Sequence, residues 1–149
     1  MASKIRVGMV GVTPSRGFSS IAHMPALGAL PDFEVAAVCT TRRESAEAAA
    51  KHYGVPLAFA DAAEMARHPD VDLVVVCVKV PDHYAPVMAA IEAGKHVYCE
   101  WPLGRTTAEA EEMRRAAEAK GVRHAVGLQG RVSPAINHAK DLIAQGYVG

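Results

Sequence analysis

The sequence predicts an α/β fold in which helices cover both faces of a doubly wound parallel sheet. Short apolar runs alternate with alanine-rich helical segments along the whole chain, and no linker, repeat or low-complexity segment interrupts this rhythm. The run Leu73–Val78 is apolar at consecutive positions. Such a strand is buried on both faces, as in a parallel sheet that helices cover on either side. Repeated strand–helix units with right-handed crossovers then predict the strand order 3-2-1-4-5-6.

The individual elements follow from the apolar pattern and from the residues that end each segment. Strands are expected over Ile5–Val10, Glu34–Cys39, Leu57–Phe59, Leu73–Val78, His96–Cys99 and His124–Leu128. Helices are expected over Ile21–Leu30, Glu44–Tyr53, Ala62–Arg67, Tyr84–Ala93, Glu109–Lys120 and about Ile136–Gln145. The patterns Thr41-x-x-Glu44 and Thr106-x-x-Glu109 predict capping boxes. Glycines typical of helix ends follow four of the helices, at Gly54, Gly94, Gly121 and Gly146.

Length and charge limit the classes of function. At 149 residues, half of them apolar, the chain is long enough for one domain with a hydrophobic core and short for two. Sixteen basic residues balance sixteen acidic ones, so there is no electrostatic footprint for nucleic acid or for an anionic membrane surface. No apolar run approaches the roughly 20 residues of a membrane span, and the N-terminus lacks the apolar stretch of a signal peptide. We therefore expect no nucleic acid and no membrane among the partners.

The cysteines and histidines indicate neither a disulfide nor a metal site. Cys39, Cys77 and Cys99 form no C-x-x-C pair, which indicates reduced thiols and a cytoplasmic location. They are expected to pack as small buried apolar side chains. None of the seven histidines shows H-E-x-x-H or similar ligand spacing, so we expect no metal.

The first strand–helix loop is a candidate phosphate-binding loop. It reads Gly-Val-Thr-Pro-Ser-Arg-Gly, so that Thr13 and Arg16 stand where a G-x-G-x-x-G motif has its later glycines. Gly11 and Gly17 would still let the backbone approach a pyrophosphate, and the next helix offers N–H donors. A plain structural turn is the alternative. The residues expected to bind a dinucleotide here are Gly11, Val12, Thr13 and Gly17, with the hydroxyls of Thr13, Ser15, Ser19 and Ser20 as further donors.

The end of the second predicted strand favours NADP(H) over NAD(H). A domain that prefers NAD usually has Asp or Glu there, bonded to the ribose 2′-hydroxyl. This chain has Thr40, Thr41, Arg42 and Arg43 instead. A carboxylate would repel a 2′-phosphate, whereas hydroxyls and two guanidinium groups would bind it through charge-assisted hydrogen bonds. The alternative is that the two arginines only solvate the start of a helix, and NAD remains a possible cofactor.

Two segments resemble a known family. Val78-Lys79-Val80-Pro81-Asp82-His83 and Glu92-Ala93-Gly94-Lys95-His96-Val97-Tyr98-Cys99-Glu100-Trp101-Pro102-Leu103 resemble the glucose–fructose oxidoreductase / inositol dehydrogenase (Gfo/Idh/MocA) family, which typically reads E-A-G-K-H-V-x-x-E-K-P-L. His23-x-Pro25-Ala26-Leu27 is similar to the family's first helix. The resemblance covers nearly the whole chain. It implies an NAD(P)-binding Rossmann domain over residues 1–149, with about 1–130 as its core and 131–149 as the start of a connection. A C-terminal α+β substrate domain, which carries the family's catalytic Asp/His pair, would follow and is absent from this chain.

The resemblance also implies further cofactor-binding positions. Glu100 and Pro102 would lie near the nicotinamide ribose, and Pro81 would line the turn before the helix that follows the fourth strand. His83 matches a family histidine at the start of that helix, with plain helix capping as the alternative. Gln129 and Arg131 fall where family residues approach the nicotinamide end. His23 would either contribute to the site or pack against the first loop.

One position departs from the family pattern. Glu100-Trp101-Pro102 replaces the family's Glu-Lys-Pro, whose lysine is important for catalysis, and an indole cannot transfer that proton. Trp101 would stack on the nicotinamide, receive a partner, or only pack in the wall of the cleft. With the closing residues 127–134 and 139–149, the substitution is similar to the subgroup of the fungal galactose-regulon repressor, which regulates transcription through protein contacts.

Two functions therefore stay open, and a third possibility is a degenerate relative that binds the cofactor only weakly. The first is the cofactor domain of an NADP(H)-dependent oxidoreductase that acts by hydride transfer on a sugar, polyol or related carbonyl compound, with its substrate bound only in the presence of the absent domain. The second is a dinucleotide-sensing regulator that acts through protein–protein contacts. A sheet edge or apolar patch left exposed by the absent domain would favour a homo-oligomer.

Overall fold

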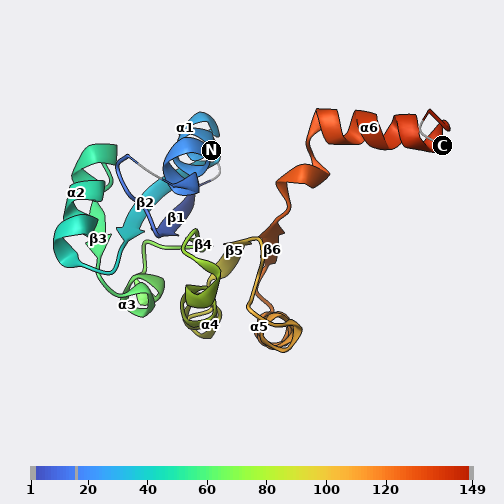
Figure 1. Ribbon diagram of the computed structural model, residues 1–149. Helices are drawn as coiled ribbons and strands as arrows, with labels where there is room; N and C mark the ends of the chain where they lie inside the picture. The colour runs from blue at the N-terminus through green and yellow to red at the C-terminus, as the bar shows by residue number, and fades with distance from the viewer. Residues whose placement is uncertain (1–2, 16, 148–149) are drawn as a thin grey trace.

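The computed structural model describes residues 3–15 and 17–147, so Arg16 and both ends of the expected domain range lie outside the described residues. Six parallel strands form one sheet in the order β3-β2-β1-β4-β5-β6, which confirms the predicted topology (Figure 1). The strands are β1 (Ile5–Val10), β2 (Phe33–Cys39), β3 (Leu57–Phe59), β4 (Leu73–Val76), β5 (His96–Glu100) and β6 (His124–Gly127).

Helices connect consecutive strands and cover both faces of the sheet. The α-helices are α1 (Met24–Ala29), α2 (Arg43–Tyr53), α3 (Ala62–Arg67), α4 (Tyr84–Glu92), α5 (Thr107–Lys120) and α6 (Pro134–Ala144). Three shorter turns are the π-helical η1 (Ser19–His23) and the 3₁₀-helical η2 (Val80–Asp82) and η3 (Gln129–Arg131). Figure 1 shows α1 and α2 on one face and α3, α4 and α5 on the other. This is the doubly wound arrangement that the apolar fourth strand predicts.

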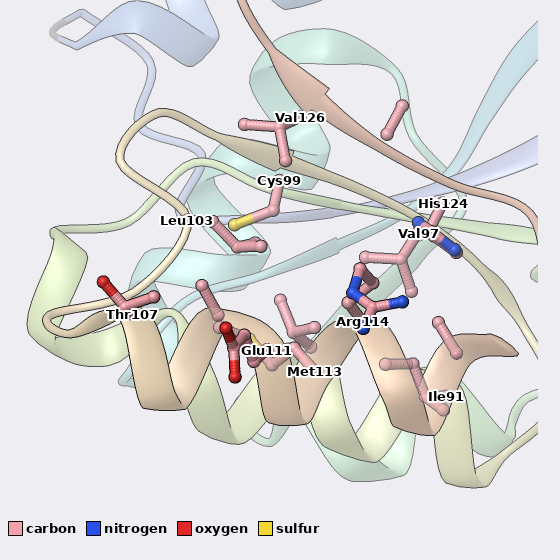
Figure 2. A pocket seen from close by; sticks show the side chains of 14 residues that line it. Ile91, Val97, Cys99, Leu103, Thr107, Glu111, Met113, Arg114, His124 and Val126 are labelled. Carbon is pink, nitrogen blue, oxygen red and sulfur yellow. The ribbon is translucent and has the colours of Figure 1, made fainter. Parts of the chain in front are cut away.

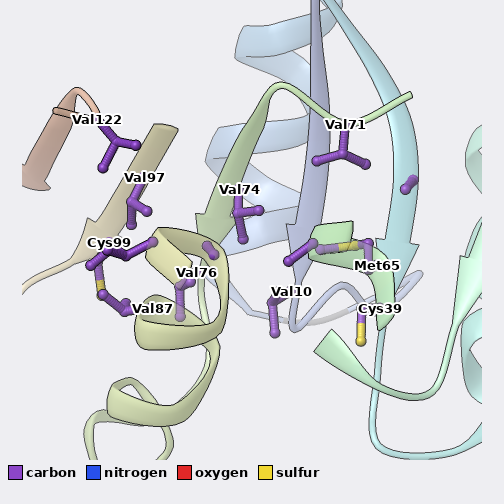
Figure 3. Packing of buried hydrophobic residues seen from close by; sticks show 14 of the residues in the cluster. Val10, Cys39, Met65, Val71, Val74, Val76, Val87, Val97, Cys99 and Val122 are labelled. Carbon is purple, nitrogen blue, oxygen red and sulfur yellow. The ribbon is translucent and has the colours of Figure 1, made fainter. Parts of the chain in front are cut away.

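The hydrophobic core has one layer on each face of the sheet. On the face of α3, α4 and α5, Val74 and Val76 of β4 pack with Met65 and Val87 (Figure 3). On the face of α1 and α2, Val75 packs in the cluster that contains Val7, Met9, Val38 and Ala49. Because successive residues of β4 enter opposite layers, the strand needs apolar side chains at every position.

Several boundaries differ from the expected ones. The fourth strand ends at Val76 rather than Val78, because its partner β5 pairs with it only as far as Cys99. The expected helix Ile21–Leu30 is divided into η1 and α1, and helical structure begins at Ser19. Pro25 lies at the start of α1 and has no backbone N–H to donate into the preceding turn. The wider π-helical turn of η1 is compatible with the absence of a backbone N–H at Pro25.

The two predicted capping boxes differ in outcome. Thr106 accepts a hydrogen bond from the Glu109 amide at 3.2 Å, as predicted, but the Glu109 carboxylate accepts from the Arg105 amide at 2.9 Å rather than from that of Thr106. The box Thr41-x-x-Glu44 is wrong: the residue that caps α2 is Arg42, and its side chain makes no capping bond. The hydroxyls of Thr40 and Ser45 instead donate to the Arg42 carbonyl, at 2.9 and 2.8 Å.

The last helix lies apart from the sheet. None of the described residues of α6 is buried, and Figure 1 shows it extending away from β6. Among the helices described, none combines the length and the apolar character that crossing a membrane requires.

Candidate functional site

The predicted site residues follow the carboxyl ends of strands along one edge of the sheet. In a doubly wound sheet, ligands bind at this edge, where the strand order reverses. Here the reversal lies at β1, between β2 and β4. The predicted residues are Gly11, Val12, Thr13 and Gly17 after β1, Thr40, Thr41, Arg42 and Arg43 after β2, Pro81 and His83 after β4, Glu100, Trp101 and Pro102 at and after β5, and Gln129 and Arg131 after β6.

Gly11 is required by the geometry of the first loop. Its φ is +91°, and an added Cβ would lie 2.8 Å from Val78 Cγ1 and 2.9 Å from the carbonyl oxygen of Cys77. Its amide donates to the Cys39 carbonyl at 2.9 Å. The end of β1 is therefore in direct contact with the ends of both neighbouring strands. A side chain at Gly11 would close the crevice between them.

Other side chains fix the loop through its carbonyl oxygens. Ser19 Oγ donates to the carbonyl of Gly11 at 3.0 Å, Ser20 Oγ donates to that of Thr13, and Tyr53 Oη donates to Thr13 at 3.1 Å. The hydroxyls of Ser19 and Ser20 thus hold the turn instead of facing a ligand, contrary to the expectation that they serve as phosphate donors. Val12 is fully buried, so that only its backbone can face a cofactor.

The end of β2 presents basic and hydroxyl groups. Thr40 Oγ1 lies 2.5 Å from Ser45 Oγ, and this hydroxyl pair fixes the turn into α2. Arg43 Nε donates to Glu47 Oε1 at 2.7 Å, one turn along the same helix. The guanidinium group of Arg42 is exposed and has no ion-pair partner among residues 3–15 and 17–147. Of the two arginines, Arg42 is the one available to an anionic ligand.

His83 faces the protein interior. Its side chain is only 1% exposed, with Nδ1 3.0 Å from the carbonyl oxygen of Pro102 and Nε2 3.0 Å from that of Val78. The imidazole thereby connects the loop after β4 to the loop after β5. Within this structure His83 can act on a ligand only by holding these two loops in place.

A hydrogen-bonded group of side chains occupies the carboxyl end of β5. His23 Nε2 lies 2.6 Å from Glu100 Oε1, and Gln129 Nε2 donates to Glu100 Oε2 at 2.7 Å. The two members of the His23–Glu100 pair are 15% and 14% exposed. Three different elements, η1, β5 and η3, therefore meet at one carboxylate.

Cys77 completes a cluster with His23 and Glu100. One donor atom from each of the three lies within 4.8 Å of the others, a set of ligand types that could hold a metal ion. No ligand spacing along the sequence indicates this cluster, because its members come from three distant parts of the chain: η1, the residue after β4, and β5. Burial, with the charge of Glu100, raises the pKa of the Cys77 thiol to about 12. Cys39 and Cys99 are buried in the core, as expected for small apolar side chains, whereas Cys77 is only partly buried.

Trp101 lies next to Glu100, on the solvent-exposed side of the hydrogen-bonded side chains. Its side chain is 65% exposed and lines a shallow hollow of about 300 Å³ with the turn that contains Gln129 and Arg131. The indole is therefore accessible and is not packed as part of the wall.

A second hollow lies away from the predicted residues. It measures about 300 Å³ and is lined mainly by apolar side chains between α5 and the strands β5 and β6. Figure 2 shows Met113, Val97 and Cys99 on its walls and Glu111 and Arg114 on α5. None of the predicted site residues lines it.

The residues at the sheet edge fit a nicotinamide dinucleotide. Gly11 and Gly17 have φ values of +91° and +90°, and among the described residues an added Cβ at Gly17 would meet only Ser19 Oγ, at 4.0 Å. The turn thus combines one glycine in close contact with the sheet and one that leaves open space for a ligand. Arg42 follows β2 and Glu100 ends β5, so that their side chains belong to strands on either side of this turn. An extended ligand with an anionic end and a polar end suits this arrangement.

The sequence left the role of His23 open and did not indicate Ser45 or Tyr53, and the structure brings all three to the site. His23 was identified only through a family motif, and its contact with Glu100 spans 77 positions. Ser45 and Tyr53 fix the two loops through single hydroxyl bonds.

Comparison with known proteins gives a consistent picture. Residues 5–128 match the Gfo/Idh/MocA family, described as an oxidoreductase family with an NAD-binding Rossmann fold. Dehydrogenase aclE of Aspergillus oryzae is 40% identical over 156 residues, covering 100% of this chain and 42% of that protein. The galactose/lactose metabolism regulatory protein GAL80 of Saccharomyces cerevisiae is 33% identical over 157 residues, covering 99% of this chain and 36% of that protein.

A solved structure supports the same arrangement. KijD10, a 3-ketoreductase from Actinomadura kijaniata in complex with TDP-benzene and NADP, superposes with a TM-score of 0.88 at 26% sequence identity. The match covers 99% of this chain and 45% of that one. The chain thus spans less than half the length of these relatives.

Proposed function

Because the chain belongs to the Gfo/Idh/MocA oxidoreductase family, with its NAD-binding Rossmann fold, we propose that it binds NADP(H) for hydride transfer on a sugar, polyol or related carbonyl compound. Its binding of a nicotinamide dinucleotide follows from the family, and a structural neighbour holds NADP. The resemblance to both a dehydrogenase and a GAL80 regulator is confirmed by the relatives. The preference for NADP, the substrate class and the reaction are our proposal.

The proposed preference for NADP rests on the guanidinium group of Arg42. It caps α2 at the end of β2, and its guanidinium group is exposed without an ion-pair partner in the described part of the chain. The residues after β2 carry hydroxyl and guanidinium groups up to Arg43, where an NAD-preferring domain has a carboxylate. A guanidinium binds a 2′-phosphate through paired N–H donors and has nothing comparable to bind on a 2′-hydroxyl.

The remaining site residues would position the cofactor. The turn between Gly11 and Gly17 would receive the pyrophosphate, because a side chain at Gly11 cannot be accommodated and Gly17 faces open space. Glu100, held by Gln129, and the exposed Trp101 would lie at the nicotinamide half. Pro81, Pro102 and Arg131 would line the same edge, and His83 would hold two of its loops. When bound, the cofactor supplies hydride exchange at the nicotinamide ring.

Calorimetric titration of the chain with NADPH and, separately, with NADH tests the proposal. We expect NADPH to bind at least about tenfold more tightly, because charge-assisted bonds to a phosphate are each worth about 1.5 kcal/mol or more. Replacing both Arg42 and Arg43 by alanine should weaken NADPH far more than NADH. Arg115→Ala removes an exposed arginine on α5 and serves as the control, with no effect on either ligand. Equal losses for both cofactors in the double variant contradict the preference.

A regulator that senses the dinucleotide is the second candidate. Trp101 stands where the family has its lysine, and the indole is 65% exposed at the cofactor edge. An exposed aromatic side chain is suited to receive a protein partner, and GAL80 is a relative. The test is an assay of the chain within its full-length protein on a panel of sugars and polyols with NADP⁺. Steady turnover supports the oxidoreductase, and binding of NADP(H) without turnover favours the regulator.

A further inference from the structure

A hydrogen bond between His23 and Glu100 fixes the two side chains relative to each other. Their side chains meet at 2.6 Å although 77 positions separate them, and each is about 15% exposed. A hydrogen bond to a carboxylate in a site with little water is stronger than the same bond at the surface. The contact therefore ties the end of η1 firmly to the carboxyl end of β5.

Two aromatic rings hold the imidazole in place. Phe18 meets the ring of His23 edge-on at a centroid distance of 5.3 Å and an angle of 82°, and Tyr98 does so at 5.6 Å and 75°. Edge-on contacts between rings at these distances are attractive. Because both neighbours restrict the orientation of the ring, Nε2 is directed at Glu100.

The Glu100 carboxylate is held from its other side as well. Gln129 Nε2 donates to Oε2 at 2.7 Å. The backbone also packs closely here, since an added Cβ at Gly127 would lie 2.8 Å from Glu100 Oε1 and 2.6 Å from Tyr98 Oη. Both carboxylate oxygens thus have a partner, and the surrounding atoms leave little freedom to rotate.

The charge of Glu100 lacks the cation that the family pattern would provide beside it. Trp101 occupies that position, and no Lys or Arg side chain pairs with Glu100 in the part of the chain that the structure describes. Burial raises the pKa values of Cys77, Tyr98 and Cys99, and the charge of the Glu100 carboxylate raises each of them further. The imidazole is the basic group in direct contact with it.

We propose that His23 is a positioning residue that fixes Glu100 toward the nicotinamide half of the bound cofactor, a role that rests on the proposed function above. Glu100 contacts the cofactor, and His23 acts through Glu100. A tryptophan can then stand beside Glu100, because the orientation of the carboxylate no longer depends on a neighbouring ammonium group.

The test compares NADPH with adenosine 2′,5′-bisphosphate, which is the adenine half of NADP without the nicotinamide half. We expect His23→Ala to weaken NADPH binding about tenfold, as for loss of a hydrogen bond to a charged group, and to leave binding of the bisphosphate unchanged. His23→Gln should recover part of the affinity for NADPH, because its amide can donate to the same oxygen. His138→Ala, on the exposed helix α6, is the control and should change neither affinity.

The outcomes separate a positioning role from a structural one. Equal losses for NADPH and the bisphosphate in His23→Ala would mean that the histidine only supports the first loop, and would overturn the inference. Unchanged NADPH affinity in His23→Ala would also overturn it, while leaving the proposed function intact. If the wild-type chain binds neither NADPH nor the bisphosphate, the proposed function is wrong, and the inference that rests on it is wrong as well.

Discussion

Arg43 is bound to Glu47 by a hydrogen bond of 2.7 Å from Nε to Oε1, so that one of the two arginines at the end of β2 already has an anionic partner. The pair spans one turn of α2, and both side chains are more than half exposed. Glu47 therefore competes with a 2′-phosphate for Arg43 and adds a negative charge near the place where that phosphate would bind.

Glu47→Ala is expected to strengthen NADPH binding. The substitution frees Arg43 and removes a like charge, which at an exposed position is worth about 0.5 kcal/mol, or roughly twofold in affinity. NADH affinity should stay the same, because NADH has no 2′-phosphate. Glu118→Ala breaks the comparable Arg114–Glu118 pair on α5 and is the control for a change in net charge alone. Calorimetric titration of the wild type, Glu47→Ala and Glu118→Ala with NADPH and NADH provides the measurement. Weaker NADPH binding by Glu47→Ala would contradict the assignment of Arg43 to the 2′-phosphate.

Gly11→Ala should both destabilise the fold and abolish cofactor binding. The new methyl group would lie within 3 Å of Val78 and of the Cys77 carbonyl, at a φ of +91°. Strain and overlap together predict a loss of about 2–4 kcal/mol in the free energy of unfolding, measured by urea denaturation. Gly54→Ala is the matched control: its φ is +67° and no atom of residues 3–15 and 17–147 lies within 4 Å of the added Cβ. It should cost only about 1 kcal/mol. Similar losses in both variants would show that the contact with Cys77 and Val78 is unimportant.

The strand order and the two-layered core could be predicted from the sequence because they depend on local patterns. The apolar run of β4 requires cover on both faces, and repeated strand–helix units leave few topologies. The same logic predicted which loops share an edge, because the carboxyl ends of parallel strands lie together. Residues such as Gly11 and Arg42 were therefore placed at the correct edge from their position after a strand.

Side-chain directions and long-range contacts could not be predicted in this way. The sequence does not reveal that His83 points inward between two loops or that His23 reaches Glu100, because both depend on how three elements pack. The capping box at Thr41 was wrong for a local reason: the Thr40 and Ser45 hydroxyls hold the same turn through the backbone of the neighbouring residue. Competing hydrogen bonds of similar strength decide such details.

The opposite edge of the sheet provides a pH-dependent contribution to stability. Arg6 Nε and Nη2 donate to the two oxygens of Asp72, at 2.9 and 2.8 Å, and this bonding lowers the pKa of Asp72 from 3.8 to about 2. A lowered pKa in the folded state means that the contribution is fully present above about pH 4 and is lost as the pH falls toward 2.

Asp72→Asn should therefore lower the free energy of unfolding at neutral pH by about 1 kcal/mol, a value reduced for the partial exposure of the pair. Between pH 4 and pH 2 the wild-type chain should lose stability faster than the variant. Asp70→Asn is the control, because Asp70 accepts a single bond from Arg6 and is more exposed. Urea denaturation across this pH range provides the measurement, and parallel curves for wild type and Asp72→Asn would contradict the prediction.

Trp101 is the only tryptophan of the chain, which makes its fluorescence a direct report on the nicotinamide half of the site. The indole is 65% exposed and follows Glu100 directly, so a nicotinamide ring bound near that carboxylate would lie close enough to quench it. We expect NADPH to quench the tryptophan emission and to gain emission of its own by energy transfer. Adenosine 2′,5′-bisphosphate should leave the tryptophan emission unchanged, because it lacks the nicotinamide.

Trp101→Phe supplies the control for this signal. The variant should lose the fluorescence response while calorimetry still detects NADPH binding, since the exposed indole is expected to contribute about 1 kcal/mol or less through stacking. Loss of binding in this variant would make Trp101 a principal cofactor contact. An equal response of the wild-type chain to both ligands would instead mean that the indole senses a change at the adenine half, and would contradict the placement of the nicotinamide beside Glu100.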